Sequence, residues 1–227
     1  MVIKRHNKKP APSIVSRSRL QSPTEEIANS AVHGFGLVAM VVATPLLIRR
    51  AAAVGDAVFV AGVWVFCASA IILYFSSSLY HALPAGREKR FFLALDYYAI
   101  FLLIAGTYTP FTLGVLRGAW GWSLFAVIWG LAAAGILLKM FAASDNPVRT
   151  ALPYLLMGWV IVIAIKPLIE MVPLSGLILL LAGGLFYSFG VLFYAGLSWV
   201  PFGHAVWHLF VCAGTGCHAV AIYRYGV

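Results

Sequence analysis

Three histidines in apolar surroundings are the residues of this chain best suited to metal chemistry. His204 and His208 are four residues apart, so on a helix both imidazoles point to the same side. His81 lies near the end of another apolar run. Imidazole nitrogen is a preferred zinc ligand, and three protein ligands leave a fourth coordination position for water. If the histidines meet at one depth, they predict a Zn²⁺ site, with zinc as the cofactor.

Two further polar residues occur near the same depth and are the candidates for catalysis. Asp96 is six residues beyond Arg90, about 9 Å into its apolar run if that run is helical. Ser77 precedes His81 by four residues and shares its helix face. Asp96 could orient a water or fix the tautomer of a ligand, and Ser77 could do the same with its hydroxyl. A zinc-bound water has a pKa near 7, so hydrolysis is the expected chemistry.

The composition shows what kind of structure must position these groups. The chain has 227 residues, of which 62% are hydrophobic and 10% charged, against roughly 45–50% and about 25% in soluble proteins. Continuous apolar runs of about 20 residues suit transmembrane helices. The strands of a membrane β-barrel would instead alternate apolar and polar residues. We therefore expect an all-α integral membrane protein, with no room for a large soluble enzyme domain.

Seven transmembrane helices use most of the chain. Ser22, Pro23 and Glu25 form a helix-start signal with a capping box. We expect residues 1–21 to form a disordered basic tail and residues 22–227 the seven-helix domain. The prolines at positions 110, 153 and 167 should interrupt their helices, and residues 87–90 should form a charged loop. The predicted spans are 27–48, 57–83, 91–113, 120–141, 150–169, 174–197 and 204–223.

The distribution of basic residues predicts the orientation. With a cytoplasmic N-terminus, eleven Lys and Arg residues fall on the inside and five of the 16 outside. The positive-inside rule therefore favours a cytoplasmic N-terminus and an external C-terminus. The first 21 residues have no apolar core of a signal peptide. We expect a multi-pass protein of the plasma membrane, which is the inner membrane if the source is a bacterium.

The expected partners follow from the same charges. The net charge is +9, and six basic residues precede Ser22. Beside a membrane span, such a tail suits an anionic lipid surface better than nucleic acid. We therefore expect membrane lipids as partners, no nucleic acid and no soluble protein partner. Self-association as a homo-oligomer is left open.

Other polar or small residues have simpler interpretations. His218 lies about 15 Å beyond His208 along the helix and suits an interhelical hydrogen bond. His33 and Asn29 could support the pocket together with Glu26, or simply pack between helices. Glu25 is explained as a helix cap. The pair at positions 183 and 184 is Gly-Gly and suits close helix approach.

The motifs around these residues resemble those of a known family. They are EEIANSAVHGFG, SSSLYHAL with Ser77 and His81, LDYYAIFLLIAGTYTPF with Asp96, and GHAVWHLFVCAGTGCHA with His204 and His208. Over about residues 22–225 the chain is similar to the hemolysin III group. That group belongs to the progestin and adipoQ receptor family, which is related to adiponectin receptors and alkaline ceramidases. The resemblance implies a seven-helix fold with zinc on the three histidines, Asp96 contacting the metal-bound water and Ser77 beside the site.

These observations favour a zinc-dependent hydrolase that acts on a lipid amide or ester at the inner leaflet. A second interpretation is a non-catalytic membrane sensor or homeostasis protein with structural zinc. A hemolysin-like pore is a third, but seven apolar spans offer no evident polar conduit. A transporter would need charged groups on broken helices near the midplane, which this sequence lacks.

Overall fold

The computed structural model of the chain describes residues 21–141, 146–197 and 200–226. The tail predicted for residues 1–21 lies almost wholly outside these ranges. The helices are α1 (Pro23–Ala52), α2 (Ala57–Ala82), α3 (Arg87–Leu113), α4 (Ala119–Phe141), α5 (Pro147–Gly158), α6 (Ile165–Met171), α7 (Leu174–Val191) and α8 (Gly203–Tyr225). A 3₁₀ segment, η1 (Trp159–Ala164), joins α5 to α6, and a π-helical segment, η2 (Leu192–Gly196), follows α7.

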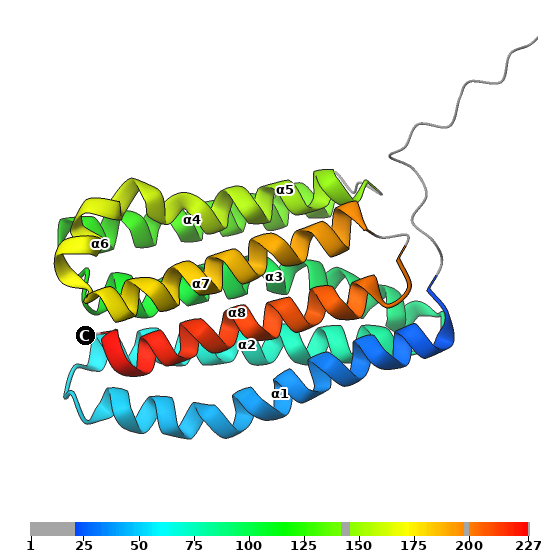
Figure 1. Cartoon of the computed structure of the whole chain (residues 1–227), viewed down its shortest axis with the longest axis horizontal. Coiled ribbons are helices and arrows are strands. Elements are labelled where there is room, and N and C mark those ends of the chain that lie inside the picture. Colours follow the sequence, from blue (N-terminus) through cyan, green and yellow to red (C-terminus); the bar gives the residue numbers. More distant parts are fainter. Residues whose placement is uncertain (1–20, 142–145, 198–199, 227) are drawn as a thin grey trace, which may run out of the picture.

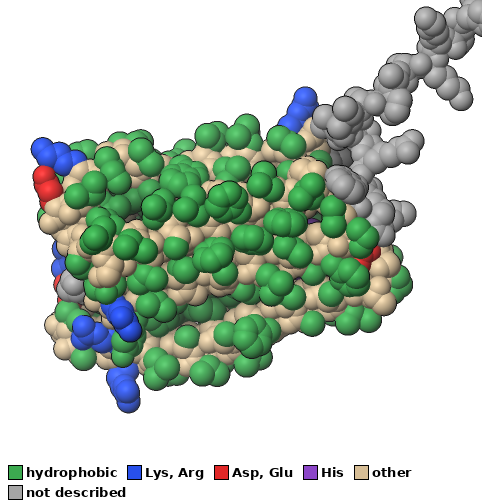
Figure 2. All heavy atoms as spheres, viewed as in Figure 1, with side chains coloured by type: hydrophobic (Ala, Val, Ile, Leu, Met, Phe, Trp, Pro, Cys, Tyr) green, Lys and Arg blue, Asp and Glu red, His purple; other side chains and the backbone are tan. Residues whose placement is uncertain are grey.

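These elements form seven helical stretches long and apolar enough to cross a membrane, as predicted. Large hydrophobic side chains point outward along the bundle; Phe35, Ile163 and Leu174 are each at least 70% exposed. Figure 2 shows hydrophobic side chains over the length of the visible face, with Lys and Arg gathered at its two ends. A surface of this kind is stable in lipid and not in water. The chain is therefore a multi-pass membrane protein.

The seven stretches run side by side along the long axis of the molecule (Figure 1). α1 packs against α2 and α8, α3 packs against α2 and α4, and α7 packs against α8. The beginnings of α1 and α8 lie at one end of the bundle, and the C-terminus lies at the other. We call the first of these the histidine end, because His81, His204 and His208 lie there.

The predicted charged loop at residues 87–90 is wrong, because these residues form the first turn of α3. The turn at residues 84–86 suffices to reverse the chain after α2 ends. Arg87 and Arg90 are exposed, and charged side chains at a helix end can reach the polar layer of a membrane. The helix can therefore extend beyond the apolar span.

The predicted interruptions at Pro110 and Pro153 are also wrong, since both lie inside continuous helices. Membrane helices tolerate proline where hydroxyl side chains and neighbouring helices satisfy the backbone. Pro110 has no N–H to donate to the Gly106 carbonyl, and α2 packs closely at this point, where the Pro110 backbone lies 3.2 Å from the position of a methyl group on Gly62. The fifth span changes instead at Trp159, where η1 begins, and Pro167 lies in the first turn of α6.

At the end of the bundle opposite the histidines, an ion pair links α2 to the turn after α3. Arg117, in the turn after α3, lies 2.6 Å from Asp56, the N-cap of α2. The hydrogen bond from Arg117 and those from the first backbone amides of α2 lower the pKa of Asp56 to about 2. Because this pKa is lowered, the pair persists at neutral pH and is lost only as the pH falls towards 2.

Candidate metal centre

His81, His204 and His208 converge at the histidine end, as the sequence predicts. One ring nitrogen from each lies within 4.8 Å of the others. The closest pair is His81 Nε2 and His208 Nε2, 3.1 Å apart. His81 and His208 are 4% and 2% exposed, and His204 is partly buried. Helices separated by more than 120 residues of chain thus bring three imidazoles to one point.

The start of α8 is held in place by a carboxylate from α1. Ser22 and Glu25 form the predicted capping box of α1. Glu25 also accepts a hydrogen bond from the backbone amide of Phe202 at 2.8 Å. Phe202 caps α8 in a left-handed conformation with φ of 57°, and free amides at a helix start favour a negative partner. Glu25 thereby anchors the start of α8, the helix that carries His204.

A second carboxylate of α1 contacts His81 directly. Glu26 Oε2 lies 2.6 Å from His81 Nδ1. The other Glu26 oxygen lies 3.2 Å from Lys89 Nζ of α3, and Lys89 also donates to the Leu83 carbonyl at 3.2 Å. The Asn29 amide lies 3.4 Å from the same His81 nitrogen. The sequence associated Glu26 with the pocket only loosely, because no local pattern joins positions 26 and 81.

The donor set fits a metal ion. Two nitrogen ligands of a tetrahedral zinc, each at about 2.0–2.1 Å from the ion, are separated by roughly 3.3 Å. The 3.1 Å between His81 Nε2 and His208 Nε2 is close to this value. Without a cation, the same distance suits a hydrogen bond between the two rings. Since Nδ1 of His81 faces a carboxylate, its Nε2 is the nitrogen left with a lone pair. The three histidines could therefore hold a metal ion.

The two predicted catalytic residues occupy different positions around this cluster. Asp96 is 9% exposed and lines the same cavity as the histidines. Ser77 is fully buried beside Asp96, close enough for its hydroxyl to interact with the carboxyl. The two groups lack the geometry of a regular hydrogen bond. Only Asp96 is therefore placed to meet a molecule in the cavity, with Ser77 behind it.

Four tyrosines near Asp96 belong to the site but were not found from the sequence. They line the cavity and come from α2, α3, α5 and η2: Tyr80, Tyr97, Tyr154 and Tyr194. Tyr80, Tyr154 and Tyr194 are each close enough to Asp96 for a charge on its carboxyl to act on their hydroxyl groups. The Tyr154 hydroxyl donates to the Tyr97 carbonyl at 3.1 Å. Tyr97 could have been singled out because it follows Asp96. The others have no such signal, since tyrosine is common at span ends.

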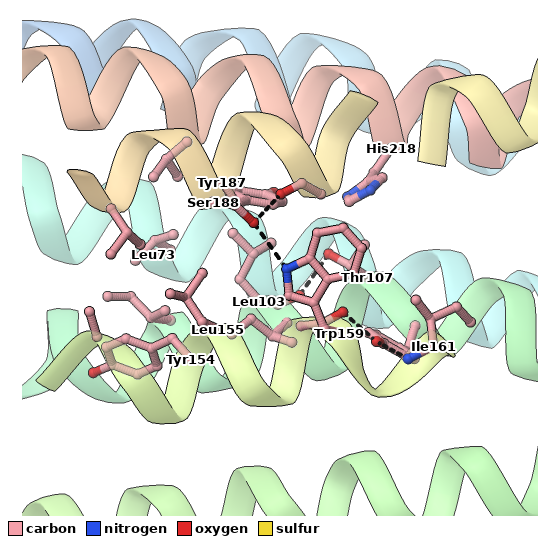
Figure 3. Close-up of a pocket in the computed structure, with 18 of the residues that line it drawn as sticks. Leu73, Leu103, Thr107, Tyr154, Leu155, Trp159, Ile161, Tyr187, Ser188 and His218 are labelled. Atoms are coloured by element: carbon pink, nitrogen blue, oxygen red, sulfur yellow. Dashed lines mark hydrogen bonds between the residues drawn. The ribbon is translucent and has the colours of Figure 1, made fainter. Parts of the chain in front are cut away.

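A cavity of about 430 Å³ extends from the histidines far into the bundle. Its wall reaches Leu116 and Leu168 towards the opposite end and consists mainly of apolar side chains. In Figure 3, Leu103 and Thr107 face Tyr187 and Ser188 across the middle of this cavity. Trp159 also lines this cavity, and its indole donates to the Ser188 hydroxyl at 3.0 Å. The cavity suits a long apolar group whose polar end lies at the histidines.

The other two histidines of the described residues, His33 and His218, have the supporting roles considered from the sequence. His218 Nε2 donates to the Leu180 carbonyl of α7 at 3.2 Å, so the predicted interhelical hydrogen bond is confirmed. His33 packs against His208, with ring centroids 3.6 Å apart, and meets the edge of Tyr74. Both ring nitrogens of His33 are buried without a hydrogen bond in the described residues. His33 thus packs between the helices directly beside the cluster.

Comparison with known proteins identifies the same group that the motifs resemble. The family model described as haemolysin-III related matches residues 21–219. Hemolysin-3 of Bacillus cereus is 45% identical over 191 residues, covering 84% of this chain and 87% of that protein. The Hemolysin-3 homolog of Bacillus subtilis (strain 168) is 39% identical over 203 residues, covering 89% and 95%.

A human protein is related more distantly. The monocyte to macrophage differentiation factor of Homo sapiens is 28% identical over 210 residues, covering 88% of this chain and 84% of that protein. The family match and the two bacterial relatives each extend over more than four-fifths of the chain. On this evidence, the chain is a member of the haemolysin-III related family.

Proposed function

We propose that this protein is a zinc-dependent hydrolase that cleaves an amide or ester bond of a membrane lipid at the inner leaflet. The observation that carries this proposal is the position of the three histidines and Asp96 at one end of a long apolar cavity. A lipid acyl chain would fill the cavity, and its polar linkage would lie beside the histidines. The proposed leaflet follows from the positive-inside rule.

Different residues of the chain would bind the metal, transfer the proton and orient the catalytic carboxyl. Zinc, when bound by the three histidines, would supply a Lewis acid and a nucleophile at neutral pH. Asp96 would take a proton from an attacking water and return it to the leaving group. Ser77 lies behind Asp96 and would orient its carboxyl. The apolar wall excludes bulk water, which strengthens each polar interaction at the site.

The proposal is tested by measuring metal content and turnover together. We expect the purified full-length protein to contain about one zinc per chain and to release fatty acid from one member of a panel of N-acyl amides and acyl esters. The triple variant His81→Ala, His204→Ala, His208→Ala should lose both. His218→Gln is the matched control, because His218 is a buried histidine outside the cluster, and it should retain the metal.

A structural role for the metal is the second candidate. The histidines come from α2 and α8, so a bound cation would cross-link these helices, as in structural zinc sites. Metal in the wild-type protein with no turnover of any lipid in the panel would favour this candidate. The names of the bacterial relatives suggest lysis, but the mainly apolar cavity does not favour an ion-conducting pore.

A further inference from the structure

Glu26 makes the shortest polar contact to any histidine of the cluster in the described residues. Its Oε2 lies 2.6 Å from His81 Nδ1, and the two residues come from different helices. His81 points its other nitrogen, Nε2, at His208 Nε2 over 3.1 Å. The imidazole of His81 therefore stands between a carboxylate on one side and the candidate metal position on the other.

A carboxylate only accepts hydrogen bonds, so this contact places the proton of neutral His81 on Nδ1. The lone pair then resides on Nε2, the nitrogen that a metal requires. A carboxylate partner also holds the ring orientation and increases the basicity of the ligand nitrogen. The contact thus selects both the tautomer and the direction of His81.

The carboxylate is itself fixed by a third helix. Lys89 of α3 binds the second Glu26 oxygen at 3.2 Å and the Leu83 carbonyl at 3.2 Å. Its ammonium group also lies 4.8 Å from the centre of the Tyr80 ring. The Glu26 and Lys89 side chains are 25% and 19% exposed, so this pair lies at the edge of the site. Lys89 leaves one Glu26 oxygen free to face His81.

We infer that Glu26 is a positioning residue that prepares His81 to bind the metal, and that Lys89 holds Glu26 in place for this task. The inference rests on the metal site of the proposed function, but it does not require that the protein hydrolyse a lipid. It assigns Glu26 a role separate from the neighbouring Glu25, which caps α1 and anchors Phe202.

Zinc affinity of the purified full-length protein, measured by competition with a chelator, tests this inference. We expect Glu26→Ala to weaken zinc binding by about 10–100-fold, the usual effect of removing such a partner. Glu26→Gln should weaken it less, because the amide oxygen can still accept from Nδ1. Lys89→Met should also have a smaller effect than Glu26→Ala. Glu88→Gln, at an exposed position in the same region, is the matched control and should bind zinc like the wild type.

A second measurement separates positioning from a merely structural role. In the metal-free protein with ¹⁵N-labelled histidine, NMR should show His81 protonated at Nδ1 in the wild type. In Glu26→Gln, His81 should shift towards a mixture of tautomers while the other histidine signals stay in place. This NMR measurement does not depend on turnover. If Glu26→Ala fails to fold, the isosteric Glu26→Gln still allows the inference to be tested.

The outcomes distinguish this inference from the proposed function. Wild-type zinc affinity in both Glu26 variants, or His81 protonated at Nε2 in the wild type, would overturn the role of Glu26 and leave hydrolysis standing. Weaker zinc binding in the Glu26 variants, in a protein that cleaves no lipid, would support Glu26 and remove the hydrolase. A wild-type protein that binds no metal would overturn both.

Discussion

At the scale of single residues, two adjacent acids of α1 perform separate tasks. Glu25 caps its own helix and accepts from Phe202 at the start of α8, whereas Glu26 contacts His81 on α2. Neighbouring side chains on a helix point about 100° apart, so consecutive residues can reach two different helices. The first turn of α1 therefore contacts both of the helices that carry the histidine cluster.

Asp96 is the residue whose replacement best separates catalysis from metal binding. Asp96→Asn keeps the size of the side chain but removes its ability to accept a proton. We expect fatty acid release to fall by about 10²–10⁴-fold, the usual contribution of a general base. Zinc content should remain that of the wild type, because Asp96 is not among the three clustered ligands. Metal analysis and a turnover assay on the same preparation measure both.

Glu88→Gln provides the control for loss of one negative charge from α3, since Glu88 is exposed. It should leave turnover unchanged. An Asp96→Asn protein that turned over lipid at the wild-type rate would show that Asp96 takes no part in the chemistry. The apolar cavity would then need another base.

At the scale of elements, the contact between α7 and α8 depends on one glycine of a pair. A methyl group at Gly183 would overlap the His218 ring, whereas one at Gly184 would meet nothing within 4 Å. The predicted close approach is thus confirmed for Gly183 and wrong for Gly184. His218 also donates to the α7 carbonyl of Leu180, so its ring has little freedom to move away.

The two glycines form a matched experiment on stability. Gly183→Ala should destabilise the protein by about 1–3 kcal/mol, because the added methyl overpacks a buried contact. Gly184→Ala should be neutral or stabilising by up to about 1 kcal/mol, since alanine is the better helix former. Thermal unfolding of the purified proteins in detergent compares them. Equal effects of the two substitutions would contradict this account of the helix contact.

At the scale of the whole molecule, the cavity connects the histidine end with the opposite half of the bundle. Thr107 lines its middle, about 16 Å along α3 from Asp96, and lies across from Tyr187 in Figure 3. Five of the seven spanning stretches contribute most of the wall: those of α2, α3, α5 with α6, α7 and α8. No single helix could create such a space, so the cavity is a property of the assembled bundle.

A bulky side chain at Thr107 tests whether an acyl chain occupies this space. Thr107→Phe should reduce turnover of long-chain substrates by about tenfold or more, as expected for steric overlap of 1–3 kcal/mol. Short-chain substrates end before this position and should react normally. Val127→Phe is the control, because Val127 is 47% exposed on the outer face of α4. Equal loss for short and long chains would contradict this placement of the substrate.

The fold class and part of the site could be predicted from the sequence because their signals are local. The length of an apolar run determines whether a helix spans a membrane, and the four-residue spacing of His204 and His208 places both on one face. The depth of His81 follows from counting along its own helix. These predictions hold without knowledge of which helices are neighbours.

The tertiary structure alone decided which side chains meet. The contact of Glu26 with His81 joins positions 55 residues apart, and the tyrosines near Asp96 come from four separate elements. Such contacts depend on the rotation of each helix about its axis, which packing against neighbours determines. The same packing lets Pro110 stay inside a continuous helix and leaves the long cavity open. The sequence of each segment determines the length of its apolar run. Which side of a helix faces its neighbour is determined only when the bundle assembles.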